Sequence, residues 1–501
     1  MKTKPKNKNL ILTLSVNLLF FMGCASGIVA VKKEAEIQKA LPKSFVQKSG
    51  SPKIYGDQEE DFNANNIKAS KKSSAELKWE YFFTDLNLKN LINEALKNNQ
   101  ELNIITQEIK IAKNEMMARQ GEFLPKLGLG AHSGVERVGE YTHQGVTDRT
   151  AEYEPGKFIP RDLRHYSFGL NFSWEMDIWS KLRNATKSAL YRYLASVDGR
   201  NFMTTKLVAE ISSSYYELLA LDKQLEIVEK NIKIQRDAVK LVELQQKTAK
   251  VTSLAVKRFE AEVLKNRSRR YELRQEIVQA ENRINFLLGR YPQPVVRTSN
   301  DFMAISLIDV YGGIPSSLLE KRPDVKQAQN KLKASNLDVK VARAKFYPSL
   351  SIDADVGYEA FNLKHLLKPE SLFYSVIGGL TAPLLNRKAI KADYLTSNSK
   401  QVQAVFEYEQ VMIKAYTEVV NQMSKVNNLE KTYVLKAKQA ELLTSSVDIS
   451  NILFRAARAD YVEVLMTRRD ALEAQIELVE VKLRQMEAVV SLYKSLGGGW
   501  H

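Results

Sequence analysis

Residues 99–127 read NQELNIITQEIKIAKNEMMARQGEFLPKL, and residues 322–350 read RPDVKQAQNKLKASNLDVKVARAKFYPSL. The two stretches align without a gap at an offset of 322 − 99 = 223. In each stretch a helical pattern gives way to a strand pattern at a proline, Pro125 or Pro348. Self-similarity at a fixed offset indicates one structural unit that occurs twice, so we expect a chain built from two similar halves.

The match continues toward the end of each half. Residues 252–256 (TSLAV) match residues 459–463 (ADYVE) at an offset of 207, and Leu288-Gly289 matches Leu496-Gly497 at an offset of 208. Both halves therefore share one order of features: helix, proline, strands, long helix, helix, glycine. We expect a first repeat, a crossover and a second repeat at 79–289, 290–318 and 319–501.

Long helices with coiled-coil spacing are expected in both halves. Apolar residues recur every seven positions in two interleaved series, which Ser214 and Gln235 interrupt: Leu207, Ile211, Leu218, Leu221, Leu225, Val228, Ile232, Val239 and Val242. The last helix repeats this spacing from Leu465 to Tyr493. The first long helix would measure about 100 Å at 1.5 Å per residue. The predicted long helices cover about 184–249, 253–288, 387–456 and 460–496.

The N-terminus has the features of an export signal. A basic segment at 1–9 precedes an apolar stretch at 10–22, and Gly23 and Cys24 follow. The apolar stretch is too short to span a bilayer as a helix, but it fits the core of a secretory signal. We expect residues 1–23 to be a signal peptide and Cys24 to be lipidated after cleavage.

Four shorter segments alternate apolar and polar residues, which is typical of strands. In the clearest one, Tyr166, Phe168, Leu170, Phe172 and Trp174 alternate with polar or small residues. Each segment is long enough for a tilted strand to cross hydrocarbon. Four strands cannot close a barrel, so an exported chain with this pattern must pool strands with copies of itself. The predicted strands cover about 127–138, 165–175, 350–360 and 372–382.

Composition and charge exclude several other classes of protein. The formal net charge is +16, but four lysines lie in the leader, so 16 − 4 = +12 remains, interleaved with acids along the helices. We therefore expect no nucleic-acid partner. The single cysteine excludes an internal disulfide and a zinc site built from several cysteines. Because no catalytic motif occurs and the five histidines are scattered, we expect no enzyme activity, no metal site and no cofactor except the lipid on Cys24.

Together these features resemble the TolC-like outer membrane factor family, specifically its lipoprotein branch in tripartite efflux systems of the RND type. The motifs that carry the resemblance keep the doubled order along most of the mature chain. They are Trp79, DLNL (85–88), LINEAL (91–96), WEMDIW (174–179), RPDV (322–325), ARAKFYPS (342–349) and LYKSLGGGW (492–500).

The resemblance implies a mainly α-helical protein with transmembrane β-structure. A homotrimer would form a 12-stranded β-barrel, with four strands per chain, continued by a long α-helical periplasmic barrel of coiled coils. A mixed α/β equatorial belt would contain the crossover at 290–318, and residues 24–78 would form a lipidated strap or linker. The implied function is a passive exit duct for small molecules in the outer membrane, in contact with its lipid, a periplasmic adaptor protein and an inner-membrane RND-type pump.

The resemblance also implies a gate where the paired helices of the second half end, at the sequence RADYVE that starts at Arg458. Asp460 and Glu463 are three residues apart on a first helical turn, so they face the same way, with Tyr461 beside them. Threefold symmetry would turn them into a ring of six carboxylates, for which Arg455 and Arg458 are the nearest partners. Without the resemblance, acids at a helix N-terminus are ordinary partners of the helix dipole.

Two departures from the family pattern and three alternatives remain open. Phe21 and Met22 differ from the usual residues of a lipoprotein cleavage site, and Met466 stands where the family often has a further gate acid. A duct for type I protein secretion or for metal-ion efflux would use the same tunnel. A structural coiled-coil lipoprotein of the envelope would explain the heptads but would leave the four amphipathic strands unused.

Overall fold

The computed structural model describes residues 77–248, 251–298, 302–305, 321–385, 387–456 and 458–500. The predicted signal peptide, Cys24, nearly all of the predicted strap at 24–78 and more than half of the predicted crossover lie outside these residues. Among the helices of the described residues, none combines the length and the hydrophobicity that a membrane span requires.

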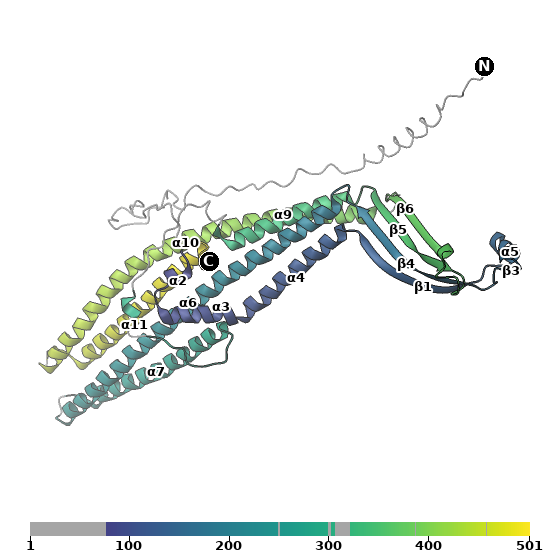
Figure 1. The fold of residues 1–501 in the computed structure, drawn as a ribbon. Helices are drawn as coiled ribbons and strands as arrows, with labels where there is room; N and C mark the ends of the chain where they lie inside the picture. Colours follow the sequence, from purple (N-terminus) through teal and green to yellow (C-terminus); the bar gives the residue numbers. More distant parts are fainter. Residues whose placement is uncertain are drawn as a thin grey trace, which may run out of the picture. The chain divides into compact units, whose positions relative to one another are not determined.

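The two halves repeat one order of elements (Figure 1). The first half contains α2 (Trp79–Phe82), α3 (Leu86–Asn98), α4 (Gln100–Phe123), β1 (Lys126–Glu136), α5 (His143–Thr150), β2 (Glu152–Glu154), β3 (Lys157–Phe158), β4 (Leu163–Met176), α6 (Lys181–Lys247) and α7 (Ser253–Leu287). The second half contains η4 (Phe302–Ala304), α9 (Pro323–Ala344), β5 (Ser349–Ala360), η5 (Pro369–Ser371), β6 (Leu372–Thr381), α10 (Lys388–Arg455) and α11 (Tyr461–Ser495).

Helix α6 begins three residues before its predicted start at 184. The reason lies in Asp177, whose carboxylate accepts hydrogen bonds from the backbone N–H groups of Leu182 and Arg183 at 3.0 and 2.9 Å. These bonds satisfy two of the N–H groups that a helix start leaves without intrahelical partners. The heptad pattern gives no signal for such a cap, because the capping residue precedes the helix by several positions.

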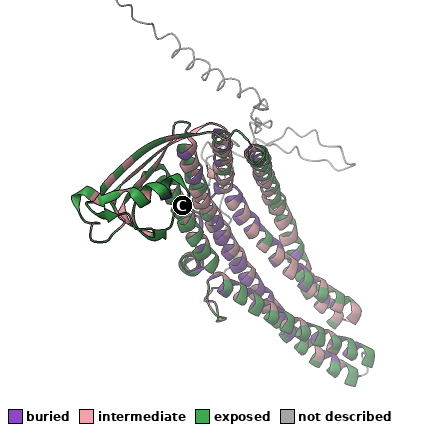
Figure 2. Ribbon diagram, turned by 90° about the vertical axis from the view of Figure 1, so that its right-hand side faces the viewer, coloured by how far each residue is buried: buried purple, intermediate pink, exposed green. Residues whose placement is uncertain are grey.

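Strands β1, β4, β5 and β6 form one antiparallel sheet in that order. The register places Leu170 opposite Leu129 on one side and opposite Val356 on the other, so apolar residues of neighbouring strands share one face. On the other face Asn171 donates a hydrogen bond from its side-chain amide to Asp355 at 2.6 Å. Most sheet residues are exposed or half-buried in the single chain (Figure 2).

In both halves the residue at the start of one helix contacts the last turn of another helix. We call this contact the joint. Asn99 begins α4 and donates from its side-chain amide to the carbonyl of Leu287, in the last turn of α7, at 2.9 Å. Arg322 begins α9 and donates to the carbonyl of Ser495, in the last turn of α11, also at 2.9 Å. Donor and acceptor positions in the two halves differ by 223 and 208 residues, as in the sequence alignment.

A glycine in the left-handed region completes each joint. Gly289 has φ 67° and Gly497 has φ 92°. A Cβ atom on Gly497 would lie 2.8 Å from the carbonyl oxygen of Lys321, which is too close for a carbon atom. Both the backbone angle and the space therefore require glycine, which explains why this residue ends both repeats.

Substitution of Gly497 by alanine is expected to lower the stability of the folded protein by about 1–3 kcal/mol, because alanine strains the left-handed backbone and meets Lys321. The matched control is Gly121→Ala in α4, where nothing lies within 4 Å of an added Cβ. That control is expected to leave stability unchanged or to raise it. Thermal unfolding in detergent measures the stability of both variants. Equal melting temperatures would contradict the claim that position 497 requires glycine.

Candidate functional site

Helices α6 and α7 form a hairpin with a mainly apolar interior. Its buried side chains include Val228, Ile232 and Val242 from α6 and Phe259, Val263, Leu273 and Ile277 from α7. One buried polar pair interrupts them, in which Asn266 donates from its amide to the Oε1 atom of Gln235 at 3.0 Å. Gln235, an exception in the heptad pattern, therefore has a partner. Such a pair fixes the alignment of the two helices. Elsewhere in this hairpin the Oδ1 atom of Asn231, the Oε1 atom of Gln245 and the Nε atom of Arg270 are buried without a partner.

Helices α10 and α11 form the equivalent hairpin of the second half, but polar contacts join its lower part. After Val419, Ala440 is the only apolar residue of α10 that is buried. The contacts between the helices there include Arg468 to Asn451 at 2.7 Å, Gln475 to Thr444 at 3.0 Å, Lys436 to Glu477 at 2.6 Å and Gln485 to the carbonyl of Leu429 at 3.1 Å. Water can replace such partners, so this hairpin loses less free energy on opening than an apolar one.

Arg468 is the least satisfied member of this polar row. Its Nη2 atom donates to Asn451, whereas its Nε and Nη1 atoms are buried without a partner. Burial lowers the pKa of the Arg468 guanidinium, and the nearby charge of Arg455 lowers it further. An arginine keeps its proton under these conditions, so the buried positive charge opposes the pairing of α10 and α11.

The predicted gate residues lie at the turn between these two helices. Asp460 is the N-cap residue of α11, and its side chain makes no capping hydrogen bond. Glu463 is exposed in the first turn of α11, so both carboxylates are open to solvent. Arg455 ends α10, and the backbone N–H of Arg458 donates to the carbonyl of Leu453 at 2.9 Å. Within the described residues, neither arginine forms an ion pair with Asp460 or Glu463.

Tyr461 has a different role from the two acids. With Leu465 it packs against a buried cluster at the end of the first hairpin, formed by Val242, Ala255, Val256 and Phe259. The structure therefore brings Tyr461 to the contact between the two hairpin tips and leaves the acids outside it. Sequence reasoning missed Arg468, although polar residues at heptad-spaced positions on α10 and α11 were a readable signal.

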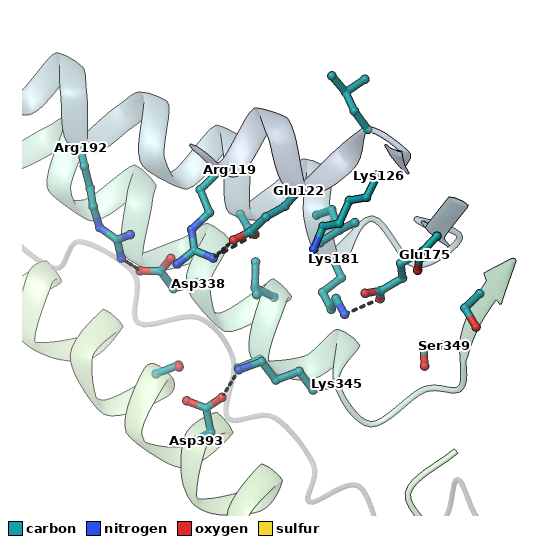
Figure 3. Close-up of a pocket in the computed structure, with 18 of the residues that line it drawn as sticks. Arg119, Glu122, Lys126, Glu175, Lys181, Arg192, Asp338, Lys345, Ser349 and Asp393 are labelled. Carbon is teal, nitrogen blue, oxygen red and sulfur yellow. Dashed lines mark hydrogen bonds and ion pairs between the residues drawn. The ribbon is translucent and has the colours of Figure 1, made fainter. Parts of the chain in front are cut away.

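A second site lies where the helices meet the polar face of the sheet. It is a cavity of about 960 Å³ (Figure 3). Ion pairs cross or border it, such as Arg119 with Glu122 at 3.0 Å and Lys345 with Asp393 at 2.7 Å. Arg192 also pairs with Asp338, and Lys181 with Glu175. Ser173, Ser351 and Asp353 of the polar sheet face line the same cavity, so its wall is hydrophilic.

The chain thus consists of a sheet with one apolar and one polar face and of long helices that continue from it. A hydrophilic cavity lies where the two meet. The family model described as outer membrane efflux protein matches residues 91–290 and 314–498. The chain belongs to this family, whose members are outer membrane channels of efflux pumps and passive conduits rather than enzymes. The predicted family, function class and location in the outer membrane are therefore confirmed.

Curated relatives and solved structures agree with this assignment. The chain is 26% identical over 428 residues to the cation efflux system protein CusC of Escherichia coli O6:H1, with 84% of this chain and 88% of CusC covered. It is also 26% identical over 422 residues to the pyoverdine export outer membrane protein OpmQ of Pseudomonas aeruginosa, covering 84% and 87% of the two chains.

The fold resembles the open state of the MtrE outer membrane channel of Neisseria gonorrhoeae. The TM-score is 0.78 at 20% identity, over 94% of this chain and 98% of that one. The predicted fold class is therefore confirmed. Members of the family form trimers and act with adaptor and pump partners. Among the described residues, no three His, Cys, Asp or Glu side chains lie together in a way that could hold a metal ion.

Substitution of Arg468 by methionine is expected to lower the open probability of the channel in planar bilayers, because it removes a buried charge that opposes closed pairing. The matched control is Arg469→Met, since Arg469 is about half exposed and pairs only with the adjacent Asp470. The control is expected to behave like the natural protein. An unchanged or higher open probability for Arg468→Met would contradict this role of the charge.

Proposed function

We propose that three copies of this chain form the exit duct of a tripartite efflux assembly and that the α10/α11 hairpin is the moving part of its gate. The observation that carries this proposal is the difference between the two hairpins. The α6/α7 hairpin buries apolar residues from both helices along its length, whereas mainly polar contacts, including that of Arg468 with Asn451, join the lower part of α10 and α11. The second hairpin is thus the one that can separate at low free-energy cost.

The exposed acids at the end of this hairpin support a role in selecting ions at the closed gate. Asp460 and Glu463 have no ion-pair partner within the described chain, so their charges are available to the solution. Three copies would bring six carboxylates together around one axis. Such a ring attracts cations and repels itself, so it favours cation passage and weakens the closed state. Met466 adds no charge to this ring.

The partners of the duct follow from the family. We expect a periplasmic adaptor protein to engage the helical end and an inner-membrane RND-type pump to supply the energy, because members of this family are passive channels. A lipid on Cys24 would anchor the protein to the membrane in addition to the inserted strands. Mass analysis of the mature N-terminus tests this anchor.

The cargo class that the structure supports best is small hydrophilic solutes. The junction cavity is lined by charged and hydroxyl side chains, which suit hydrated molecules. The two curated relatives are equally similar to this chain but are named for a cation and for pyoverdine, so identity at this level does not separate metal-ion efflux from efflux of organic molecules. A structural coiled-coil lipoprotein, the third alternative, would not belong to an efflux channel family.

Replacement of both Asp460 and Glu463 by alanine is expected to weaken the preference for cations over anions, because the variant lacks the carboxylates at the constriction. Single-channel conductance is expected to fall, because the variant no longer concentrates cations at the constriction and the loss of repulsion between carboxylates stabilises the closed gate. The reversal potential under a salt gradient measures the first effect. Glu243→Ala, an exposed acid on the first hairpin, is the matched control and is expected to change neither quantity.

The gate assignment would be wrong if the double variant kept the natural reversal potential and conductance while still inserting as a trimer. In that case the exit-duct function would stand, and the constriction would lie elsewhere along the tunnel.

A further inference from the structure

The four histidines that the structure describes gather at one end of the molecule. His132 lies in β1, His143 begins α5, His165 lies in β4 and His365 lies in the loop between β5 and β6. Strand β1 leads away from α4 and β4 leads back to α6, so their far ends and the loops beyond them, with α5 and β3, point away from the helices (Figure 1). We call this end of the sheet its distal end.

Two of these histidines lie on the polar face of the sheet. The Nδ1 atom of His165 lies 3.4 Å from a carboxylate oxygen of Glu359 on β5. On β1, a Cβ atom added to Gly130 would lie 3.4 Å from the Nε2 atom of His132 and 2.9 Å from the side-chain oxygen of Asn171. The ring of His132 therefore extends over a position without a side chain, toward the polar side chains of β4.

The two imidazoles are neighbours on adjacent strands. The register pairs His132 with Ser167 and His165 with Gly134, so the two histidines occupy diagonal positions. Residues in such positions are about 7 to 8 Å apart, and their side chains interact. Both histidines are exposed in the single chain, and the side chain of His165 is 47% exposed. Water and protons therefore reach both rings.

The other ionisable groups on this part of the polar face are acids. The register and the alternation of side chains place Glu136, Asp355 and Glu359 on the same face as the two histidines. Beside them, β6 contributes Phe373 and Ser375, which are uncharged. Within the four described strands, no lysine or arginine lies on this face from the level of Asp355 to the distal end. We call this area the distal polar face.

The loops beyond the distal end contain charges that are largely paired with each other. Ion pairs join Arg137 to Asp162, Arg161 to Glu140 and Lys157 to Glu154. His365 contacts the ring of Tyr153 and lies close enough to Glu154 to interact with its carboxylate. Arg164 is next to His165 in the sequence, but strand alternation places it on the opposite face. The charges that face His132 and His165 are therefore those of the distal polar face.

We infer that His132 and His165 make the distal polar face a second selectivity site of the duct, which prefers cations at neutral pH and loses most of this preference in a mildly acidic exterior. The inference rests on the proposed trimeric duct, in which the apolar face of the sheet contacts lipid and the polar face lines the water-filled passage. It adds to the proposed gate a site at the opposite end of the passage.

The charges of the distal polar face give the direction of this effect. With neutral imidazoles its three carboxylates give a formal charge of −3 per copy. Imidazole is the side chain that ordinarily changes charge between about pH 5 and pH 8, whereas carboxylates ordinarily take up protons near pH 4. Two imidazolium groups leave −3 + 2 = −1 per copy. Because the local excess of cations follows the charge of the wall, the cation preference falls as the pH falls.

Reversal potentials under a salt gradient test the inference when they are measured at about pH 7.5 and about pH 5.5. The Asp460→Ala/Glu463→Ala variant is the background, so that the carboxylates of the proposed gate do not contribute. Its remaining cation preference is expected to fall by roughly half or more between the two pH values. Adding His132→Asn and His165→Asn is expected to abolish this change, because asparagine is polar but takes up no proton.

The matched control is His143→Asn in the same background, because His143 lies on α5 rather than on the sheet. This control is expected to keep the full pH dependence. Glu359→Gln is expected to lower the cation preference at about pH 7.5, since it removes one of the three carboxylates.

A conducting trimer whose pH dependence is the same with and without the two histidines would overturn the inference and leave the exit duct intact. A background variant without pH dependence, or an unchanged cation preference in Glu359→Gln, would have the same consequence. A monomer by native mass, or a natural protein that does not conduct, would overturn both the inference and the duct.

Discussion

The backbone groups along the outer edges of β1 and β6 find no strand partner within the described chain, and this constraint organises the rest of the protein. An exposed edge next to an apolar face is unstable in water and unacceptable in hydrocarbon, because unpaired N–H and C=O groups cost several kcal/mol each there. The chain therefore needs copies of itself before its sheet is complete. The helices also leave large apolar side chains exposed, such as Leu264 on α7 and Leu442 on α10. Duplication makes this possible, because two similar halves place different but matching elements at the two sides.

The two halves also differ in the contacts that hold their helical hairpins together. Both halves keep the joint in which a residue at the start of α4 or α9 holds the last turn of α7 or α11, with a glycine beside it. Below the joint the hairpins differ. The first has a mainly apolar interior with one buried polar pair, and the second has a row of polar contacts and a guanidinium, Arg468, with two of its three nitrogens buried without a partner. In the proposed duct the α10/α11 hairpin would open, while the α6/α7 hairpin would stay closed.

Most of the fold could be predicted from the sequence, because it depends on periodicity. Heptads and alternating strands report which side chains share a face, and the offset of 223 residues reported the duplication. Features that depend on contacts across the sequence could not be predicted. The early start of α6 depends on Asp177, and the elements α5, β2 and β3 lie in a segment without periodicity. At the candidate gate, the sequence indicated Asp460 and Glu463 by resemblance, but the burial of Arg468 beside Arg455 depends on how two helices face each other.

The measurement that tests the account most directly is hydrogen exchange of the assembled protein, resolved by peptide. We expect the lower parts of α10 and α11, at about 430–455 and 461–477, to exchange faster than the matching parts of α6 and α7 at about 222–247 and 253–269. Both regions lie at the same distance from the hairpin ends, so fraying alone predicts equal rates. Equal protection of the two hairpins, or faster exchange in α6 and α7, would contradict the claim that the second hairpin is the moving part of the gate.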